Sequence, residues 1–105
     1  MEFEHDNADG YPRMADEELE AYLSAKDLMT IATLNEDGWP HNTPVTMLYV
    51  DGRVAFGSLR WKKKIQNIEN DPRVSCSIEG PAASEEGEVR GVMIQGKARI
   101  LGGAD

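Results

Sequence analysis

The chain has 105 residues, enough for one small domain, and its hydrophobic fraction of 40% favours a folded globular protein over a disordered one. Its net charge of -8 argues against a nucleic-acid-binding function, and no apolar run is long enough to span a membrane. The N-terminus has neither the basic nor the apolar region of a signal peptide, and the single cysteine, Cys76, excludes an internal disulfide, so a cytoplasmic location is predicted.

The N-terminal half predicts an arm, one helix and three strands. Residues 1–14 are acidic and poor in apolar side chains, which is typical of a flexible arm. Asp16 is predicted to cap a helix that ends near Ser24, because apolar residues then share one helix face. Alternating, β-rich segments predict strands that two glycine-containing turns join into an antiparallel meander, at residues 29–34, 44–50 and 53–58.

The C-terminal half predicts a second helix and two more strands. A helix is expected at residues 61–69, because Pro72 forces its end. An alternating strand follows at 73–78, with its apolar side chains on one inward face, and then an acidic, glycine-containing loop at 79–88. Residues 89–101 predict one long strand with a bulge or bend at Gly96. Residues 15–105 are therefore expected to form one mainly β domain, a barrel of antiparallel strands with two short helices.

A basic segment stands out in this acidic chain. Residues 53–73 contain six basic and two acidic side chains, a local charge of +4, and three of the basic residues are the consecutive Lys62, Lys63 and Lys64. Cations are disfavoured at a helix N-terminus, whereas the free backbone N–H groups there suit an anion. One interpretation is therefore a phosphate site. The other is a solvated basic turn that leads into an amphipathic helix, and charge alone does not decide between them.

In this order and spacing, several short motifs resemble the pyridoxamine 5'-phosphate oxidase-like family of FMN-binding split barrels. The resemblance covers about residues 15–101. The motifs that carry it are Ala32-Thr33-Leu34, Asp37-Gly38-Trp39-Pro40-His41, Thr43-Pro44-Val45, Phe56-Gly57-Ser58, Lys64-Ile65-Gln66-Asn67-Ile68, Asn70-Asp71-Pro72-Arg73-Val74 and Gly91-Val92-Met93-Ile94-Gln95-Gly96-Lys97-Ala98.

The resemblance implies a homodimer that binds two FMN molecules in grooves between its subunits. It places backbone groups of one strand segment against the flavin ring, a second segment beside the ring and the ribityl chain, and a lysine pair on the phosphate. Lys62 stands where many members have serine, and Trp61 replaces a commonly small residue. The implied cofactor-binding residues are Thr43, Pro44, Val45, Thr46, Phe56, Gly57, Ser58, Trp61, Lys62, Lys63 and Lys64.

The implied function is an FMN-dependent oxidoreductase, flavin reductase-like or a small-molecule reductase, with a reduced nicotinamide as electron donor and a small organic acceptor. No catalytic residue is assigned and no metal site is expected, because the cofactor carries the redox chemistry. Two alternatives stay open: a deazaflavin-dependent reductase, and a non-catalytic flavin- or haem-related binding or stress protein. Family members usually continue past Leu101 with another helix and strand, so this is either a minimal barrel or part of a longer protein.

Overall fold

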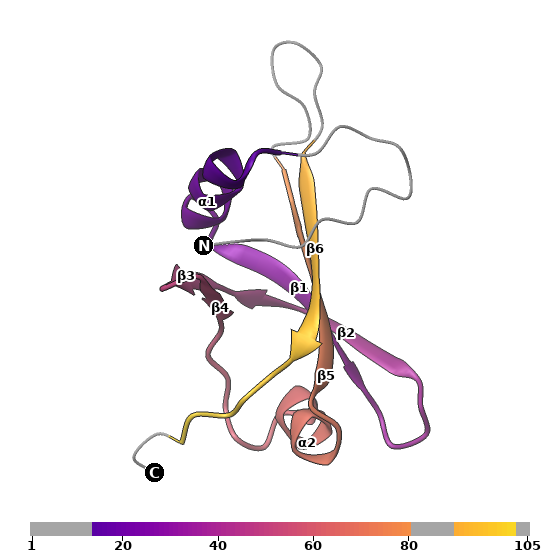
Figure 1. The fold of residues 1–105 in the computed structure, drawn as a ribbon. Coiled ribbons are helices and arrows are strands. Elements are labelled where there is room, and N and C mark those ends of the chain that lie inside the picture. Colours follow the sequence, from indigo (N-terminus) through magenta and orange to yellow (C-terminus); the bar gives the residue numbers. More distant parts are fainter. Residues whose placement is uncertain (1–13, 81–89, 103–105) are drawn as a thin grey trace.

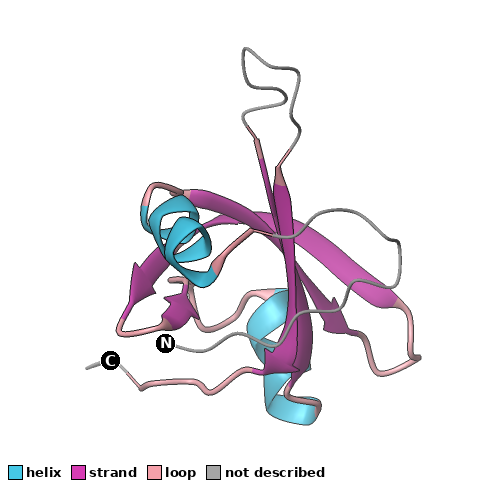
Figure 2. Cartoon of the chain, turned by 45° about the horizontal axis from the view of Figure 1, so that its top comes forward, coloured by secondary structure: helices cyan, strands magenta, loops and turns pink. Residues whose placement is uncertain are grey.

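The computed structural model describes residues 14–80 and 90–102, so the predicted N-terminal arm, apart from Met14, and nearly all of the predicted acidic loop lie outside the described residues. The described part is mainly β, as predicted, with two short helices (Figures 1 and 2). In chain order the elements are α1 (Asp16–Ser24), β1 (Leu28–Leu34), β2 (Pro40–Thr46), β3 (Leu48–Val50), β4 (Arg53–Ala55), α2 (Lys63–Asn70), β5 (Arg73–Glu79) and β6 (Gly91–Lys97).

The strands form two antiparallel sheets. Four strands pair in the order β2-β1-β5-β6, and β3 and β4 make a separate hairpin. In Figure 1, α1 lies beside this hairpin, and α2 lies at the opposite end of the molecule, just before β5 begins. The predicted three-stranded meander is therefore wrong, because β3 and β4 form a sheet of their own and do not extend the pair of β1 and β2.

The strand predicted at residues 44–50 is two strands that meet at Met47. β1 begins only at Leu28, which pairs with Thr46, so β2 has no strand partner beyond that point. The Met47 N–H donates a last hydrogen bond to the Asp27 carbonyl at 2.9 Å, and the chain then turns into the hairpin. Val45 and Met47 are both buried, so the alternation of side chains continues through the break and does not reveal it.

The core lies between α1 and the inner face of the four-stranded sheet. Leu23, Ile31 and Ile78 are each 1% exposed, and they come from α1, β1 and β5. The predicted apolar face of the first helix and the predicted inward face of β5 are confirmed. Asp16 does not cap α1, however. The cap position is Ala15, which makes no side-chain hydrogen bond. Asp16 is the first helical residue, and its negative charge there interacts favourably with the positive end of the helix dipole.

The last strand is shorter than predicted. β6 ends at Lys97, opposite Arg73, where β5 begins, so residues 98–101 have no strand beside them. Gly96 faces Val74 in unbroken register, and the predicted bulge is absent. In the described part of the chain, neither helix is long and apolar enough to cross a membrane.

Candidate functional site

An open groove of about 620 Å³ lies where β1 begins, β2 passes into β3, and β4 ends. Its walls are mainly apolar, and Leu28 and Leu48 are more than half exposed in it, at 61% and 66%. Large apolar side chains are left in contact with water here at a cost in free energy, which a flat, partly apolar ligand would relieve. The lining residues are Asp27, Leu28, Thr46, Met47, Leu48, Ala55, Phe56 and Gly57.

Three of the residues that the sequence marked as cofactor-binding line this groove. Thr46 is the last residue of β2, and Phe56 and Gly57 follow directly after β4. Phe56 is half-buried and packs against the core, which holds this wall in place. A Cβ atom at Gly57 would meet no heavy atom within 4 Å, so the backbone is open to a ligand at this point. The β3–β4 hairpin thus brings together two segments that are ten residues apart in the sequence.

The predicted residues Thr43, Pro44 and Val45 do not line the groove. Val45 is 8% exposed and belongs to the core, and Pro44 lies exposed on the other face of the sheet. Their expected role involves backbone groups, and the topology suits that role. β2 is the edge of the four-stranded sheet, so half of its backbone N–H and C=O groups point away from β1 without a strand partner. Pro44 is compatible with an edge strand because it has no N–H to pair.

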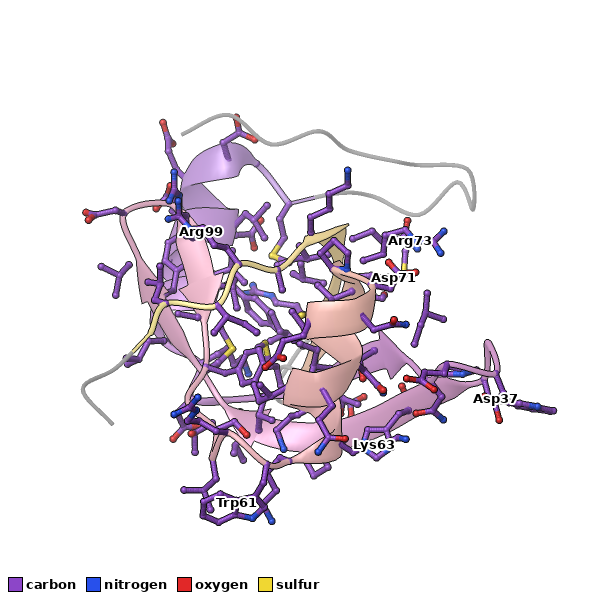
Figure 3. All side chains as sticks on the ribbon, turned by 90° about the horizontal axis from the view of Figure 1, so that it is seen from below. Asp37, Trp61, Lys63, Asp71, Arg73 and Arg99 are labelled. Atoms are coloured by element: carbon purple, nitrogen blue, oxygen red, sulfur yellow. The ribbon has the colours of Figure 1, made fainter. Side chains whose placement is uncertain are left out.

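The basic segment leads into α2 later than predicted. The helix begins at Lys63, and Lys62 is its N-cap, with no side-chain cap. Trp61 lies outside the helix, in a turn that the Lys62 N–H closes on the Leu59 carbonyl at 3.1 Å. The Gln66 side-chain amide donates to the Trp61 carbonyl at 3.0 Å, and Trp61 is 68% exposed. Figure 3 shows Trp61 and Lys63 near the N-terminal end of α2.

Within the described residues, no carboxylate pairs with the positive charge of the lysine run. Among residues 14–80 and 90–102, no ion pair involves Lys62, Lys63 or Lys64, and the first turn of α2 holds no acidic residue. At the other end of the helix, Arg73 pairs with Asp71 at 2.7 Å, as Figure 3 shows. That hydrogen-bonded pair lowers the pKa of Asp71 to about 2. The charge excess seen in the sequence is thus concentrated at the start of α2.

The lysines do not line the groove themselves. Gly57, in the groove wall, is joined to Lys63 by a short segment that contains the predicted residue Ser58. Chain length keeps the Cα atoms of Gly57 and Lys63 within about 20 Å of each other. The Ser58 hydroxyl donates to the Leu59 carbonyl at 3.2 Å and is exposed. The apolar groove and the positive charge at the start of α2 are therefore neighbours along the chain.

Asn67 is a buried polar residue to which the sequence analysis assigned no role. It is 3% exposed, and its amide donates to Thr33 Oγ1 at 3.1 Å and to Asn35 Oδ1 at 2.9 Å. A signal was present: Asn67 lies beside Ile68, and near Ile65, on the apolar side of a short helix, where an amide needs partners. The identity of those partners depends on the tertiary fold.

Cys76 lies in the core, and burial raises the pKa of its thiol, which favours the protonated, less reactive form. Within the described ranges, no group of three or more histidine, cysteine, aspartate or glutamate side chains is placed to hold a metal ion.

Comparison with known proteins identifies relatives of this fold. The family model described as pyridoxamine 5'-phosphate oxidase matches residues 15–105. Among solved structures, a conserved hypothetical protein from Mycobacterium tuberculosis is 28% identical, with a TM-score of 0.73. The match covers 81% of this chain and 52% of that protein's chain. A heme binding protein from Mycobacterium smegmatis is 27% identical (TM-score 0.69; 89% and 39% covered). An FAD-binding protein from Mesorhizobium loti is 25% identical (TM-score 0.65; 80% and 58% covered).

This chain therefore spans about half the length of the solved relatives that it matches. No curated protein matches the sequence significantly.

Proposed function

This chain belongs to the pyridoxamine 5'-phosphate oxidase family, and we propose that it is an FMN-dependent oxidoreductase, flavin reductase-like or a small-molecule reductase. The observation that carries the proposal is the lysine run at the start of α2, which pairs with no carboxylate of the described residues and lies close along the chain to an apolar groove. The family match and the similarity to an FAD-binding protein support a flavin as the ligand. A phosphate at the end of an otherwise neutral ligand explains why the two features occur together.

In this proposal the chain binds and orients the cofactor, and the flavin supplies the electron transfer. Lys63 and Lys64 donate charge-assisted hydrogen bonds to the phosphate, and the Ser58 hydroxyl is within the same segment. Phe56 and Gly57 lie beside the ring, and the free backbone groups of the β2 edge pair with its polar rim. The proposed electron donor is a reduced nicotinamide and the acceptor a small organic molecule, in the cytoplasm.

The absorption spectrum of the purified protein tests the assignment directly. We expect the flavin bands to appear in the protein fraction after incubation with FMN and removal of free ligand. A colourless protein that gains no flavin absorbance would remove the proposal. If flavin binds, the addition of a reduced nicotinamide under anaerobic conditions should bleach the bands, and an unbleached flavin would favour a binding protein without turnover.

Haem binding is the second candidate, because the heme binding protein from Mycobacterium smegmatis is similar over 89% of this chain. The open apolar groove would accept a porphyrin edge as well as a flavin ring. A Soret band that forms with added haemin, and displacement of FMN by haemin, would favour this candidate. A deazaflavin coenzyme would use the same lysines for its phosphate, and fluorescence quenching of the two cofactors in parallel distinguishes it from FMN.

We also propose that the protein is a homodimer whose interface is the outer face of the four-stranded sheet. In a chain of net charge -8, the middle of this exposed or half-buried face has no charged side chain. Two copies can therefore meet there without like-charge repulsion. The pair Leu28 and Thr46 borders both this face and the groove, so a second copy would close the groove. The neutral face consists of Thr30, Ala32, Asn42, Pro44, Ser75, Ser77, Met93 and Gln95.

Ser77→Arg should separate the dimer, because Ser77 lies between Thr30 and Met93 in the middle of the neutral face. An unpaired charge buried at an interface costs several kcal/mol, on the order of 3. We expect sedimentation velocity to show a dimer for the wild type at micromolar concentration and a monomer for this variant. Ser24→Arg, an identical change on the exposed end of α1, is the control. A dimeric Ser77→Arg protein, or a wild type that is monomeric with FMN bound, would contradict the assignment.

A further inference from the structure

We propose that Asn67 is a positioning residue that holds the lysine run of α2 in its binding geometry through its buried amide, without touching the ligand. The inference rests on the proposed function for the identity of the ligand, and goes beyond it by assigning the residue that orients the phosphate site. Asn67 is one of two polar residues that are buried in the described part of the chain, and the other is its partner Thr33.

The amide of Asn67 joins three parts of the fold. Both of its protons are used, one by Thr33 Oγ1 in β1 and one by Asn35 Oδ1 in the turn that follows. That turn is itself fixed, because the Asn35 N–H donates to the Trp39 carbonyl at 2.9 Å and the Asn35 carbonyl accepts from Gly38 at 2.8 Å. The amide therefore ties α2 to β1 and to the hydrogen-bonded turn that follows it.

Little else determines how α2 is rotated about its axis. The helix has eight residues, and among its apolar side chains only Ile68 is fully buried, at 5% exposure, while Ile65 is half-buried. Apolar contacts are non-directional and tolerate small rotations, whereas two hydrogen bonds to separate acceptors do not. A short helix also has little stability of its own. We infer that the buried amide sets the rotation of α2.

The rotation of α2 decides where the lysines point. Lys63 and Lys64 precede Asn67 by four and three residues, so all three lie on one side of the helix, one turn apart. Lys64 is half-buried and Lys63 exposed, which places the pair where the buried side of α2 meets solvent. Without the amide contacts, both lysines would keep their charge, but α2 would no longer hold them in one fixed orientation. Phosphate binding should then weaken, and binding of the ring should not.

Asn67→Asp tests this inference with almost no change in shape. It replaces the amide donor by a carboxylate that only accepts, so the hydrogen bond to Asn35 Oδ1 becomes a repulsive contact between two acceptors, and the contact with Thr33 persists only if the Thr33 hydroxyl turns to donate. We expect the dissociation constant for FMN to rise about tenfold, and that for riboflavin, which has no phosphate, to change less than about twofold. Asn70→Asp makes the same charge change on the same helix at an exposed position, and should alter both constants less than about twofold.

A residue with only a structural role would lower the melting temperature and leave the ratio of the FMN and riboflavin affinities unchanged. The ratio is therefore the decisive measurement, and Thr33→Val, which adds no charge beside the lysines, separates loss of positioning from a direct effect of the new carboxylate on the phosphate. The pH dependence provides a second measurement, because the carboxyl group that Asn67→Asp introduces regains one O–H donor when it is protonated. Relative to the wild type at each pH, the FMN preference of Asn67→Asp should recover as the pH falls, and Asn70→Asp should show no such recovery.

Thr33→Val is the second variant if Asn67→Asp does not fold. It keeps the branched shape but removes the Oγ1 acceptor, and should shift the ratio in the same direction by a smaller amount. If the wild type prefers FMN over riboflavin and these variants keep the full preference, the positioning role is wrong. If the wild type binds neither flavin, the proposed function fails, and hydrogen exchange decides the role of Asn67. The α2 amides should then exchange faster in Asn67→Asp than in Asn70→Asp, and equal rates would overturn it.

Discussion

Replacing Lys63 and Lys64 together by alanine is expected to weaken FMN binding about 100-fold or more. Each lysine can donate a charge-assisted hydrogen bond to the phosphate, and such bonds contribute ~1.5–3 kcal/mol each. Lys63 is exposed and Lys64 half-buried, so solvent screening places the effect at the lower end of that range. No carboxylate of the described residues pairs with either lysine, so their removal leaves no partner charge unpaired. Titration followed by flavin fluorescence measures the change.

Riboflavin is the matched ligand for this experiment. It has the ring but lacks the phosphate, so its affinity should be nearly equal in the wild type and the double variant. Added salt should depress FMN binding more than riboflavin binding, because only FMN binding depends on the screened charges. Lys62→Ala is the control variant, and a smaller loss is expected since Lys62 is the helix N-cap and stands outside the predicted pair. An unchanged FMN affinity in the double variant would show that the lysine run is a solvated basic turn at the start of the helix and not a phosphate site.

Ile31→Ala is expected to destabilise the fold by about 2–5 kcal/mol, the usual cost of truncating a fully buried isoleucine. Ile31 is 1% exposed in the middle of β1, between Thr43 of β2 and Cys76 of β5, so the cavity left behind cannot collapse without moving the central strands. A domain of this size has only ~5–15 kcal/mol of stability, and the melting temperature should fall by ~10 °C or more. Thermal unfolding followed by circular dichroism measures the loss.

Val50→Ala serves as the control for this truncation. Val50 is also an aliphatic strand residue, in β3, but it is 54% exposed, and surface substitutions usually change the stability by less than about 0.5 kcal/mol. The two variants together test whether the inner face of the four-stranded sheet is the core of the protein. Equal destabilisation by both would contradict the assignment of Ile31 to the core.

The local sequence pattern was sufficient to predict the helices and strands that pack one regular apolar face on the core. The helix at Asp16–Ser24 and the strands β1 and β5 appear where their apolar periodicity places them, because one face of each packs on the core. The same reasoning was wrong where an element ends for lack of a partner. β2 ends at Thr46 because β1 begins at Leu28, and β6 ends at Lys97 because β5 begins at Arg73. A strand's partner lies elsewhere in the chain, so periodicity does not report it.

For the candidate site, the sequence by itself determined which chemical groups are available. These are a lysine run in a segment of local charge +4 and a strand end with Phe56 and Gly57. The sequence also carried a family resemblance, which the family model confirms over residues 15–105. Only the tertiary structure decided which residues meet. It places Thr46 beside Phe56 and Gly57 in one groove, directs Pro44 and Val45 away from it, and ties Asn67 to Thr33 and Asn35 across more than thirty positions of sequence. Charge and periodicity are local properties of a chain, whereas a groove and a buried hydrogen bond form only when distant segments pack together.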